Sequence, residues 1–245
     1  MAISNFGDMR NINAMCSRFS VLDEEKSRAW DLELERKEKD EFNKKCYENF
    51  CSSGIAEKFK KAELSDLSVS NVFIGKNQQQ ATMQVFYDFV NDIVAGKPRM
   101  FWFCGNPGTG KTTLASAIMH EICKQGILCD YYKSHRIMQD IKNTDNFKCE
   151  NTAEGIIKNV CYNKFRVIDE IGRYPLAEWE KFRVFEITNN LYEQYKSAIY
   201  ITNMSSMELA GFMGAAATDR FRGLGLILEF KGETYRGSQN ELYIK

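Results

Sequence analysis

The chain has 245 residues, which corresponds to one large domain or to one medium domain with an appendage, since domains average roughly 100–200 residues. Its 33 basic and 33 acidic residues leave no formal net charge, and 44% of its residues are apolar. These values argue against a disordered chain and against a protein that holds nucleic acid by bulk positive charge.

The sequence carries no sign of a membrane or secreted protein. No run approaches the roughly 18 uninterrupted apolar residues that a membrane span needs. The N-terminal segment lacks a basic stretch followed by an apolar one, and the eight cysteines contain no CxxC pair. We therefore expect reduced thiols in a cytoplasmic protein that has no membrane partner.

The N-terminal part of the sequence predicts helix. Between Gly7 and Gly54 there is no other glycine and no proline, and dense charges favour helix through propensity and through pairs four residues apart. We expect one or two amphipathic helices and then a polar linker over residues 52–76. The apolar stripe belongs either to a solvated arm or to a surface that docks on a partner. The candidate docking residues are Ile12, Met15, Phe19, Leu22 and Trp30.

We place a helical module with its linker over residues 1–66 and a second domain over residues 67–245, in which the sequence pattern changes from residue 77 onward. Short apolar runs now alternate with helical patterns, which favours an α/β fold whose mainly parallel sheet is covered by helices in three layers. In chain order we expect a helix after Asn77, a strand over 100–104, a helix over 112–124, a strand over 128–132, a helix after Ser134, a strand over 165–169, a helix over 178–195, and strands over 198–202 and 226–230.

The strongest motif follows the first of these strands and precedes the next helix. The segment GNPGTGKT matches G-x-x-x-x-G-K-[ST] in full, which is the phosphate-binding loop of many nucleotide-binding proteins. Backbone N–H groups would surround the phosphates of ATP, Lys111 would reach the β- and γ-phosphates, and Thr112 would hold Mg²⁺. The residues expected to bind the nucleotide are Gly105, Asn106, Pro107, Gly108, Thr109, Gly110, Lys111, Thr112 and Thr113.

A second motif, FRVIDE, is a strand that ends in an acidic pair. Asp169 would hold the hydrated Mg²⁺, and Glu170 would act as the general base toward the attacking water. Arg166 is unusual on a strand that should be apolar on both faces, so we expect it near an edge of the sheet or with its charge extended toward solvent.

Three polar residues near later elements complete the candidate site. Asn203 follows an apolar strand and could hydrogen-bond the γ-phosphate or the attacking water. Arg220 lies in DRFR and could act on the nucleotide of a neighbouring subunit, whereas Arg236 could contact the nucleotide of its own subunit.

These motifs together, GNPGTGKTT, VIDEIG, YITN, DRFR and YR, resemble those of the AAA+ ATPases across roughly residues 70–240. More narrowly, the chain resembles the bacterial DnaC-type replicative helicase loaders and the related IstB-like transposition ATPases. The resemblance implies Walker A roles for Lys111 and Thr112 and Walker B roles for Asp169 and Glu170. It also implies that Asn203 is sensor 1, Arg220 the arginine finger and Arg236 sensor 2. The segment after Arg222 is too short for the usual AAA+ helical lid, a lack that the loaders share.

The resemblance also implies partners. In that family the N-terminal module grips a hexameric replicative helicase of the DnaB type, and the ATPase domain contacts single-stranded DNA. An arginine finger implies a homo-oligomer in the ATP-bound state and allows a free monomer. Aromatic and basic residues after the Walker B strand suit single-stranded DNA. The candidate DNA-binding residues are Arg173, Tyr174, Trp179 and Lys181.

The sequence therefore favours an ATPase that loads a replicative helicase onto single-stranded DNA and that this DNA stimulates. An IstB-like transposition helper would share the ATPase core and differ in its partner. A small-molecule P-loop kinase and an adaptor that binds ATP without hydrolysing it are further alternatives. The paired Asp169 and Glu170 argue against both of these.

Overall fold

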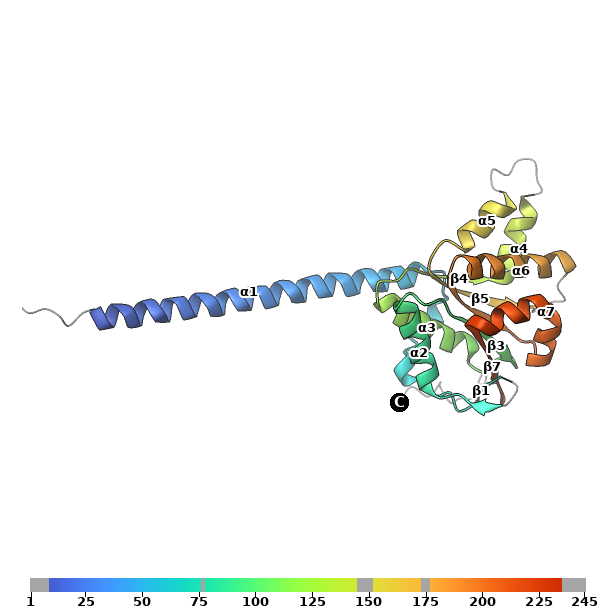
Figure 1. The fold of residues 1–245 in the computed structure, drawn as a ribbon, viewed down its shortest axis with the longest axis horizontal. Coiled ribbons are helices and arrows are strands. Elements are labelled where there is room, and N and C mark those ends of the chain that lie inside the picture. The colour runs from blue at the N-terminus through green and yellow to red at the C-terminus, as the bar shows by residue number, and fades with distance from the viewer. Residues whose placement is uncertain (1–8, 76–77, 145–151, 173–176, 235–245) are drawn as a thin grey trace, which may run out of the picture. The chain divides into compact units, whose positions relative to one another are not determined.

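The computed structural model describes residues 9–75, 78–144, 152–172 and 177–234, and only the backbone of residues 9–27, 29, 31 and 215–223. The chain divides into two compact units, the first ending at Lys45 and the second beginning at Cys46 (Figure 1). No helix among the described residues is long and apolar enough to cross a membrane.

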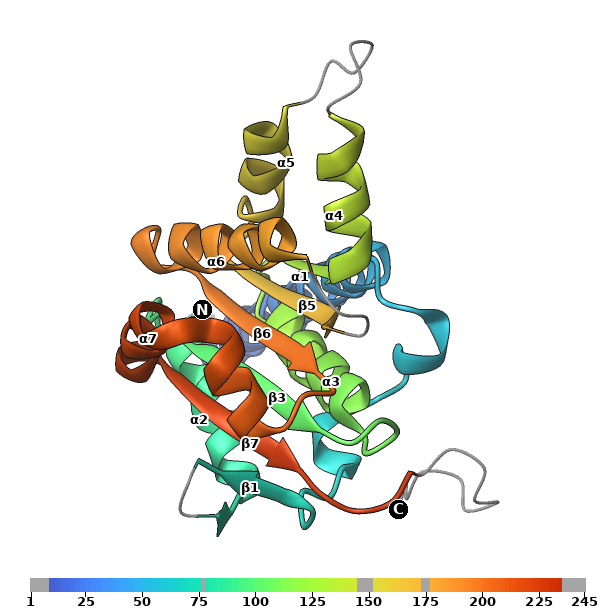
Figure 2. The same cartoon turned by 90° about the vertical axis from the view of Figure 1, so that its right-hand side faces the viewer.

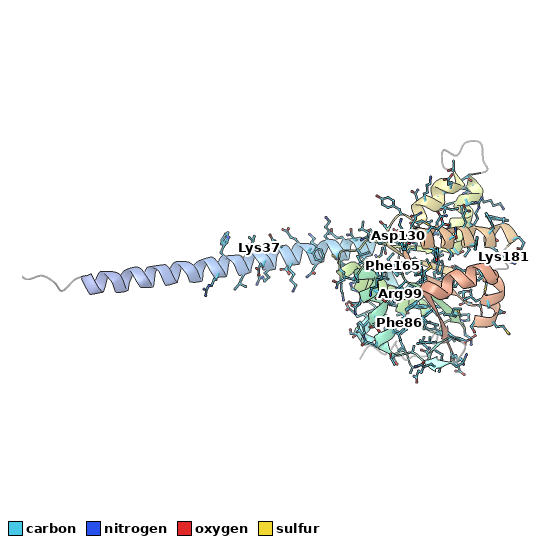
Figure 3. All side chains as sticks on the ribbon, viewed as in Figure 1. Lys37, Phe86, Arg99, Asp130, Phe165 and Lys181 are labelled. Atoms are coloured by element: carbon cyan, nitrogen blue, oxygen red, sulfur yellow. The ribbon has the colours of Figure 1, made fainter. Side chains whose placement is uncertain are left out.

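A single helix, α1 (Met9–Ser52), accounts for the described part of the first unit and continues into the second. It is uninterrupted because no glycine or proline breaks its 44 residues. Charged side chains pair along it, as Lys37 (labelled in Figure 3) does with Glu33 at 3.0 Å. Trp30 is 68% exposed. The side chains of the other four predicted docking residues (Ile12, Met15, Phe19 and Leu22) lie outside the described ones.

The second unit contains a seven-stranded sheet in the order β2-β1-β7-β3-β6-β5-β4. The five strands from β7 to β4 are parallel, and β1 and β2 add an antiparallel edge. The predicted α/β fold is confirmed, with β1 and β2 as unpredicted additions. The strands are β1 (Val72–Ile74), β2 (Gln79–Gln80), β3 (Met100–Gly105), β4 (Cys129–Lys133), β5 (Phe165–Ile171), β6 (Ser197–Thr202) and β7 (Gly225–Phe230).

Helices cover both faces of the sheet, which gives three layers (Figures 1 and 2). Successive side chains of β3 lie on opposite faces of the sheet. Phe101 and Phe103 pack in the core with α2 and α3, whereas Trp102 packs in the core with α4 to α7. Phe86 and Phe165, labelled in Figure 3, are fully buried in the first of these cores. The helices are α2 (Met83–Val94), α3 (Lys111–Lys124), α4 (Ser134–Asn143), α5 (Ala153–Val160), α6 (Glu178–Glu193) and α7 (Ser206–Leu224), the last kinked at Gly214.

The segment predicted to be a linker is instead part of the core. Phe50 and Leu64 are fully buried, and Ile55 and Val72 are at least 95% buried. Two short 3-10 helices, η1 (Glu57–Phe59) and η2 (Leu64–Asp66), lie between them. Although this segment is polar in composition, most of its apolar side chains pack in or against the core, and the boundary between the two units lies before residue 46 and not at residue 66.

Arg166 lies neither at an edge of the sheet nor extended toward solvent. Strand β5 lies between its hydrogen-bonded neighbours β6 and β4 within the sheet, and Arg166 is 0% exposed. Its Nη2 donates a hydrogen bond to the backbone carbonyl of Asn163, whereas Nε and Nη1 have no hydrogen-bond partner among the described residues. Burial lowers the pKa of Arg166, and the charge of Asp130, its neighbour across the sheet, partly opposes that effect.

Candidate nucleotide-binding site

The loop between β3 and α3 has a backbone that only glycine adopts easily. Gly105 ends β3 with φ of 111°, and a Cβ atom there would lie 2.2 Å from the carbonyl oxygen of Phe230 on the neighbouring strand. Gly110 has φ of 92° and directly precedes the first residue of α3. The first N–H groups of α3 have no partner within the helix, so the loop and the helix N-terminus together can bind phosphate.

Lys111 lies folded over this loop. Its Nζ donates hydrogen bonds to the carbonyl oxygens of Gly105 at 2.7 Å and Asn106 at 2.6 Å. The side chain of Thr109 is held by the same loop, since its Oγ1 donates to the Asn106 carbonyl at 2.8 Å. A positive charge is therefore fixed where the phosphates of a nucleotide would lie.

The P-loop helix and strand β5 meet at Asp169. Thr112 Oγ1 donates a hydrogen bond to Asp169 Oδ2 at 2.9 Å, although the two residues are far apart in sequence. Tyr131 Oη donates to the same oxygen at 2.6 Å, and the backbone N–H of Glu170 donates to Asp169 Oδ1 at 2.6 Å. The hydroxyl of Thr112 and the carboxylate of Asp169 are the oxygen ligands that Mg²⁺ prefers, so this pair can hold a hydrated Mg²⁺.

A bulge in β5 sets the direction of the acidic pair. Ile168 pairs with Tyr200 and Ile171 with Thr202, so β5 contains one more residue than β6 over this stretch. Glu170 lies within it at φ of 61°, an unusual conformation for a residue with a side chain.

Two side chains from β4 and α4 contact the predicted general base. Lys133 Nζ lies 3.3 Å from Glu170 Oε1, and His135 Nδ1 lies 3.4 Å from Glu170 Oε2. Tyr131, Lys133 and His135 were not predicted from the sequence. Their only signal was their place at the end of the strand before the Walker B strand, because parallel strands end at the same edge of a sheet.

The tip of β6 lies against the start of the P-loop. The N–H of Gly105 donates to the carbonyl of Met204 at 2.9 Å, and Thr202 Oγ1 donates to the Ile171 carbonyl at 2.8 Å. Asn203 is therefore on the correct edge of the sheet, with an exposed side chain.

For the remaining predicted site residues, the structure describes only the backbone, no position at all, or no contact with the site. Arg220 lies in the part of α7 where only the backbone is described, and Arg236, Arg173 and Tyr174 lie outside the described residues. Trp179, which is 41% exposed, and Lys181 lie in the first turns of α6. They are near the end of the Walker B strand in sequence, but no described contact joins them to the site.

Burial controls protonation beside the site. It raises the pKa of the Cys104 thiol, next to the P-loop, to about 12, so this cysteine is a neutral packing residue at physiological pH. Burial also raises the pKa of Tyr131, and the adjacent Asp169 charge raises it further. Tyr131 therefore keeps its phenolic proton, which it donates to Asp169.

The parallel strand order β7-β3-β6-β5-β4, with a P-loop after β3 and an acidic pair on β5, is that of a P-loop nucleotide-binding domain. Residues 87–242 match the model of the IstB-like ATP binding protein family, and the chain belongs to this family.

Individual relatives are similar over part of their length. The replicative helicase loader DnaC of Escherichia coli (strain K12) is 32% identical over 143 residues, which are 58% of this chain and 58% of that protein. The insertion sequence IS232 putative ATP-binding protein of Bacillus thuringiensis subsp. berliner is 29% identical over 128 residues, 52% of this chain and 50% of that protein. The chain thus spans about half the length of the curated relatives that it matches.

A solved structure shows the same fold. The crystal structure of the DnaC helicase loader aligns with a TM-score of 0.57 at 24% sequence identity, covering 72% of this chain and 100% of that chain.

Proposed function

We propose that this protein is an ATP-dependent loader that binds a hexameric replicative DNA helicase and delivers it onto single-stranded DNA. The observation that carries the ATPase part is the convergence on Asp169, which accepts a hydrogen bond from Thr112 and is followed by Glu170. The similarity to the E. coli helicase loader supports the loading part.

In this proposal each residue of the site has one task. The P-loop amides and Lys111 bind the phosphates, and Thr112 and Asp169 hold Mg²⁺. Bound Mg²⁺ would neutralise charge on the phosphate oxygens. Glu170 accepts a proton from the attacking water, and Asn203 orients that water or the γ-phosphate. The Lys133 ammonium, 3.3 Å from Glu170 Oε1, sets a positive charge beside the proposed general base.

Subunit contacts complete the site. Arg220 stabilises charge on the nucleotide of a neighbouring protomer, and Arg236 contacts the nucleotide of its own protomer. The protein is then a homo-oligomer when ATP is bound, and hydrolysis weakens both the oligomer and its hold on DNA.

The DNA contact is proposed at the start of α6. Trp179 is exposed and can stack on a base, and Lys181, which pairs with Glu178 at 2.6 Å, can exchange that partner for a phosphate. Arg173 and Tyr174, which precede α6 in the sequence and lie outside the described residues, are further proposed DNA contacts.

Helicase binding is tested in the full chain with single substitutions on α1. We expect wild-type protein to co-elute with a purified DnaB-type hexamer and Phe19→Asp or Trp30→Asp to lose that co-elution. Leu128→Asp is the control, since Leu128 is an exposed apolar residue of the second unit (48% exposed) and should bind normally. Equal binding by all four proteins would refute the role of α1.

ATP turnover is tested separately. Lys111→Ala should abolish nucleotide binding, whereas Glu170→Gln should retain binding and lose turnover. Stimulation by single-stranded DNA, with no phosphate acceptor added, distinguishes an ATPase from a small-molecule kinase.

A transposition helper is the second candidate, and the similarity to the IS232 ATP-binding protein is the observation that favours it. Association with a transposase, and none with a replicative helicase, would replace the loader proposal with this one.

A further inference from the structure

We propose that Tyr131 is a positioning residue that fixes Asp169 for Mg²⁺ binding and that joins Asp169 to the C-terminal end of helix α1. This inference rests on the proposed ATPase function and adds a residue that belongs to neither motif.

The carboxylate of Asp169 is held from three sides. One donor, Thr112 Oγ1, comes from the P-loop helix, and another is the N–H of the adjacent Glu170. The third donor is Tyr131 Oη, which lies 2.6 Å from Asp169 Oδ2 and makes the shorter of the two side-chain hydrogen bonds. Tyr131 is 8% exposed, so water competes little for this bond.

The hydrogen bond from Tyr131 to Asp169 has its largest effect when the Thr112 hydroxyl contacts Mg²⁺. Thr112 shares Asp169 Oδ2 with Tyr131 and would turn its hydroxyl oxygen toward a bound Mg²⁺. Tyr131 is then the side chain that still fixes the rotamer of Asp169. Such outer partners of metal-binding carboxylates typically change metal affinity or activity by roughly 10–100-fold when they are removed.

The backbone of Tyr131 makes the second connection. Its N–H donates to the carbonyl of Ser53 at 2.7 Å, and Ser53 directly follows the last residue of α1. Gly54 passes so close that a Cβ atom there would lie 2.7 Å from the Tyr131 carbonyl oxygen. The same residue thus bonds the end of α1 through its backbone and the Walker B carboxylate through its hydroxyl.

The end of α1 is itself anchored to the P-loop helix. The ring of Phe50 stacks on His120 of α3 with centroids 4.5 Å apart, and Ser53 Oγ donates to the Phe50 carbonyl at 2.7 Å. A displacement of this turn therefore reaches Tyr131 directly, and through it the carboxylate.

The test uses the full chain and varies the Mg²⁺ concentration. We expect Tyr131→Phe to raise the Mg²⁺ concentration for half-maximal ATP turnover by about 10-fold, the lower end of the usual range. Binding of a fluorescent ATP analogue should weaken in the presence of Mg²⁺ and stay unchanged in EDTA. Tyr132→Phe, at the next position of β4, is the control and should match wild type.

A second pair of variants tests the link to α1. Gly54→Ala should shift the Mg²⁺ requirement in the same direction as Tyr131→Phe, because its Cβ atom would push on the Tyr131 carbonyl. Gly75→Ala is the matched control, since Gly75 also has positive φ (59°) and has no atom within 4 Å of its added Cβ.

The outcomes separate the proposals. Equal Mg²⁺ requirements in wild type and Tyr131→Phe, even with a lowered melting temperature, would overturn the positioning role. Equal behaviour of Gly54→Ala and Gly75→Ala would overturn the link to α1. Absence of Mg²⁺-dependent turnover in the wild type would instead refute the proposed ATPase function.

Discussion

Replacing Phe50 with alanine tests whether the end of α1 belongs to the core of the second unit. Phe50 has no exposed surface, and its ring lies nearly parallel to His120, at 16° and a centroid distance of 4.5 Å. The substitution removes the ring and leaves a cavity between α1 and α3.

The expected magnitude follows from the buried area. An aromatic side chain buries roughly 150–250 Å², and at about 25 cal/mol per Å² its removal loses about 4 kcal/mol once the retained Cβ is counted. Measured Phe→Ala changes in cores fall at about 3–5 kcal/mol, which agrees. For a chain of this size each kcal/mol lowers the melting temperature by about 2–4 °C, so the expected decrease is about 8–16 °C.

The assay is thermal unfolding of the full chain followed by near-ultraviolet circular dichroism. Phe42→Ala is the control because Phe42 lies on the same helix and is 48% exposed, so its melting temperature should stay close to that of wild type. If Phe50→Ala lost no more stability than Phe42→Ala, residues 46–52 would not be part of the core, and a boundary between the two units before residue 46 would be wrong.

Three further predictions concern single residues. Burial, followed by the charge of Lys124, lowers the pKa of His120, so the native state favours neutral imidazole. The unfolding free energy of wild type minus that of His120→Gln should be at its maximum above pH 6.5, the ordinary histidine pKa, and should decrease as pH falls below that value. Urea unfolding at pH 7.5 and 5.5 measures this difference. Arg166→Met should leave the unfolding free energy unchanged or raise it by about 1–3 kcal/mol, because it removes a buried charge with two unbonded nitrogens; a clear loss in urea titrations would show that the Asn163 bond outweighs desolvation. Gly105→Ala should lower the melting temperature far more than Gly232→Ala, since both have φ above 100° but only Gly105 would bring a Cβ against a backbone oxygen; equal decreases would contradict this.

The parts of the fold that sequence predicted are those set by local pattern. The strand before the P-loop and the strand before Asp169 are short apolar runs, and the structure places them at 100–105 and 165–171. The motif also implied that Thr112 and Asp169 meet, because a P-loop and a Walker B carboxylate serve the same metal.

The parts that sequence did not predict depend on which strands become neighbours. Tyr131 and Lys133 reach the site because β4 pairs with β5 in a register that sets Lys133 opposite Asp169. No local pattern encodes that register, nor the extra residue that turns Glu170 to a positive φ. The failed linker prediction has a similar cause: a polar average concealed a few apolar residues whose burial depends on α3.

The segment after α1 contacts α3 and the P-loop at separate points. Near the C-terminal end of α3, Glu63 pairs with Lys124 at 2.9 Å. In its middle, Ser116 Oγ donates to the carbonyl of Phe59 at 2.9 Å.

At the P-loop itself, Asn71 Nδ2 donates to the carbonyl of Thr109 at 3.3 Å. The conformation of the loop is therefore supported from outside its own motif by Asn71, which directly precedes β1. A nucleotide that favours the P-loop arrangement supported by Asn71 also stabilises the contact of this segment with the loop. Because such linkage is reciprocal, a partner that displaces the segment weakens nucleotide binding by the same free energy.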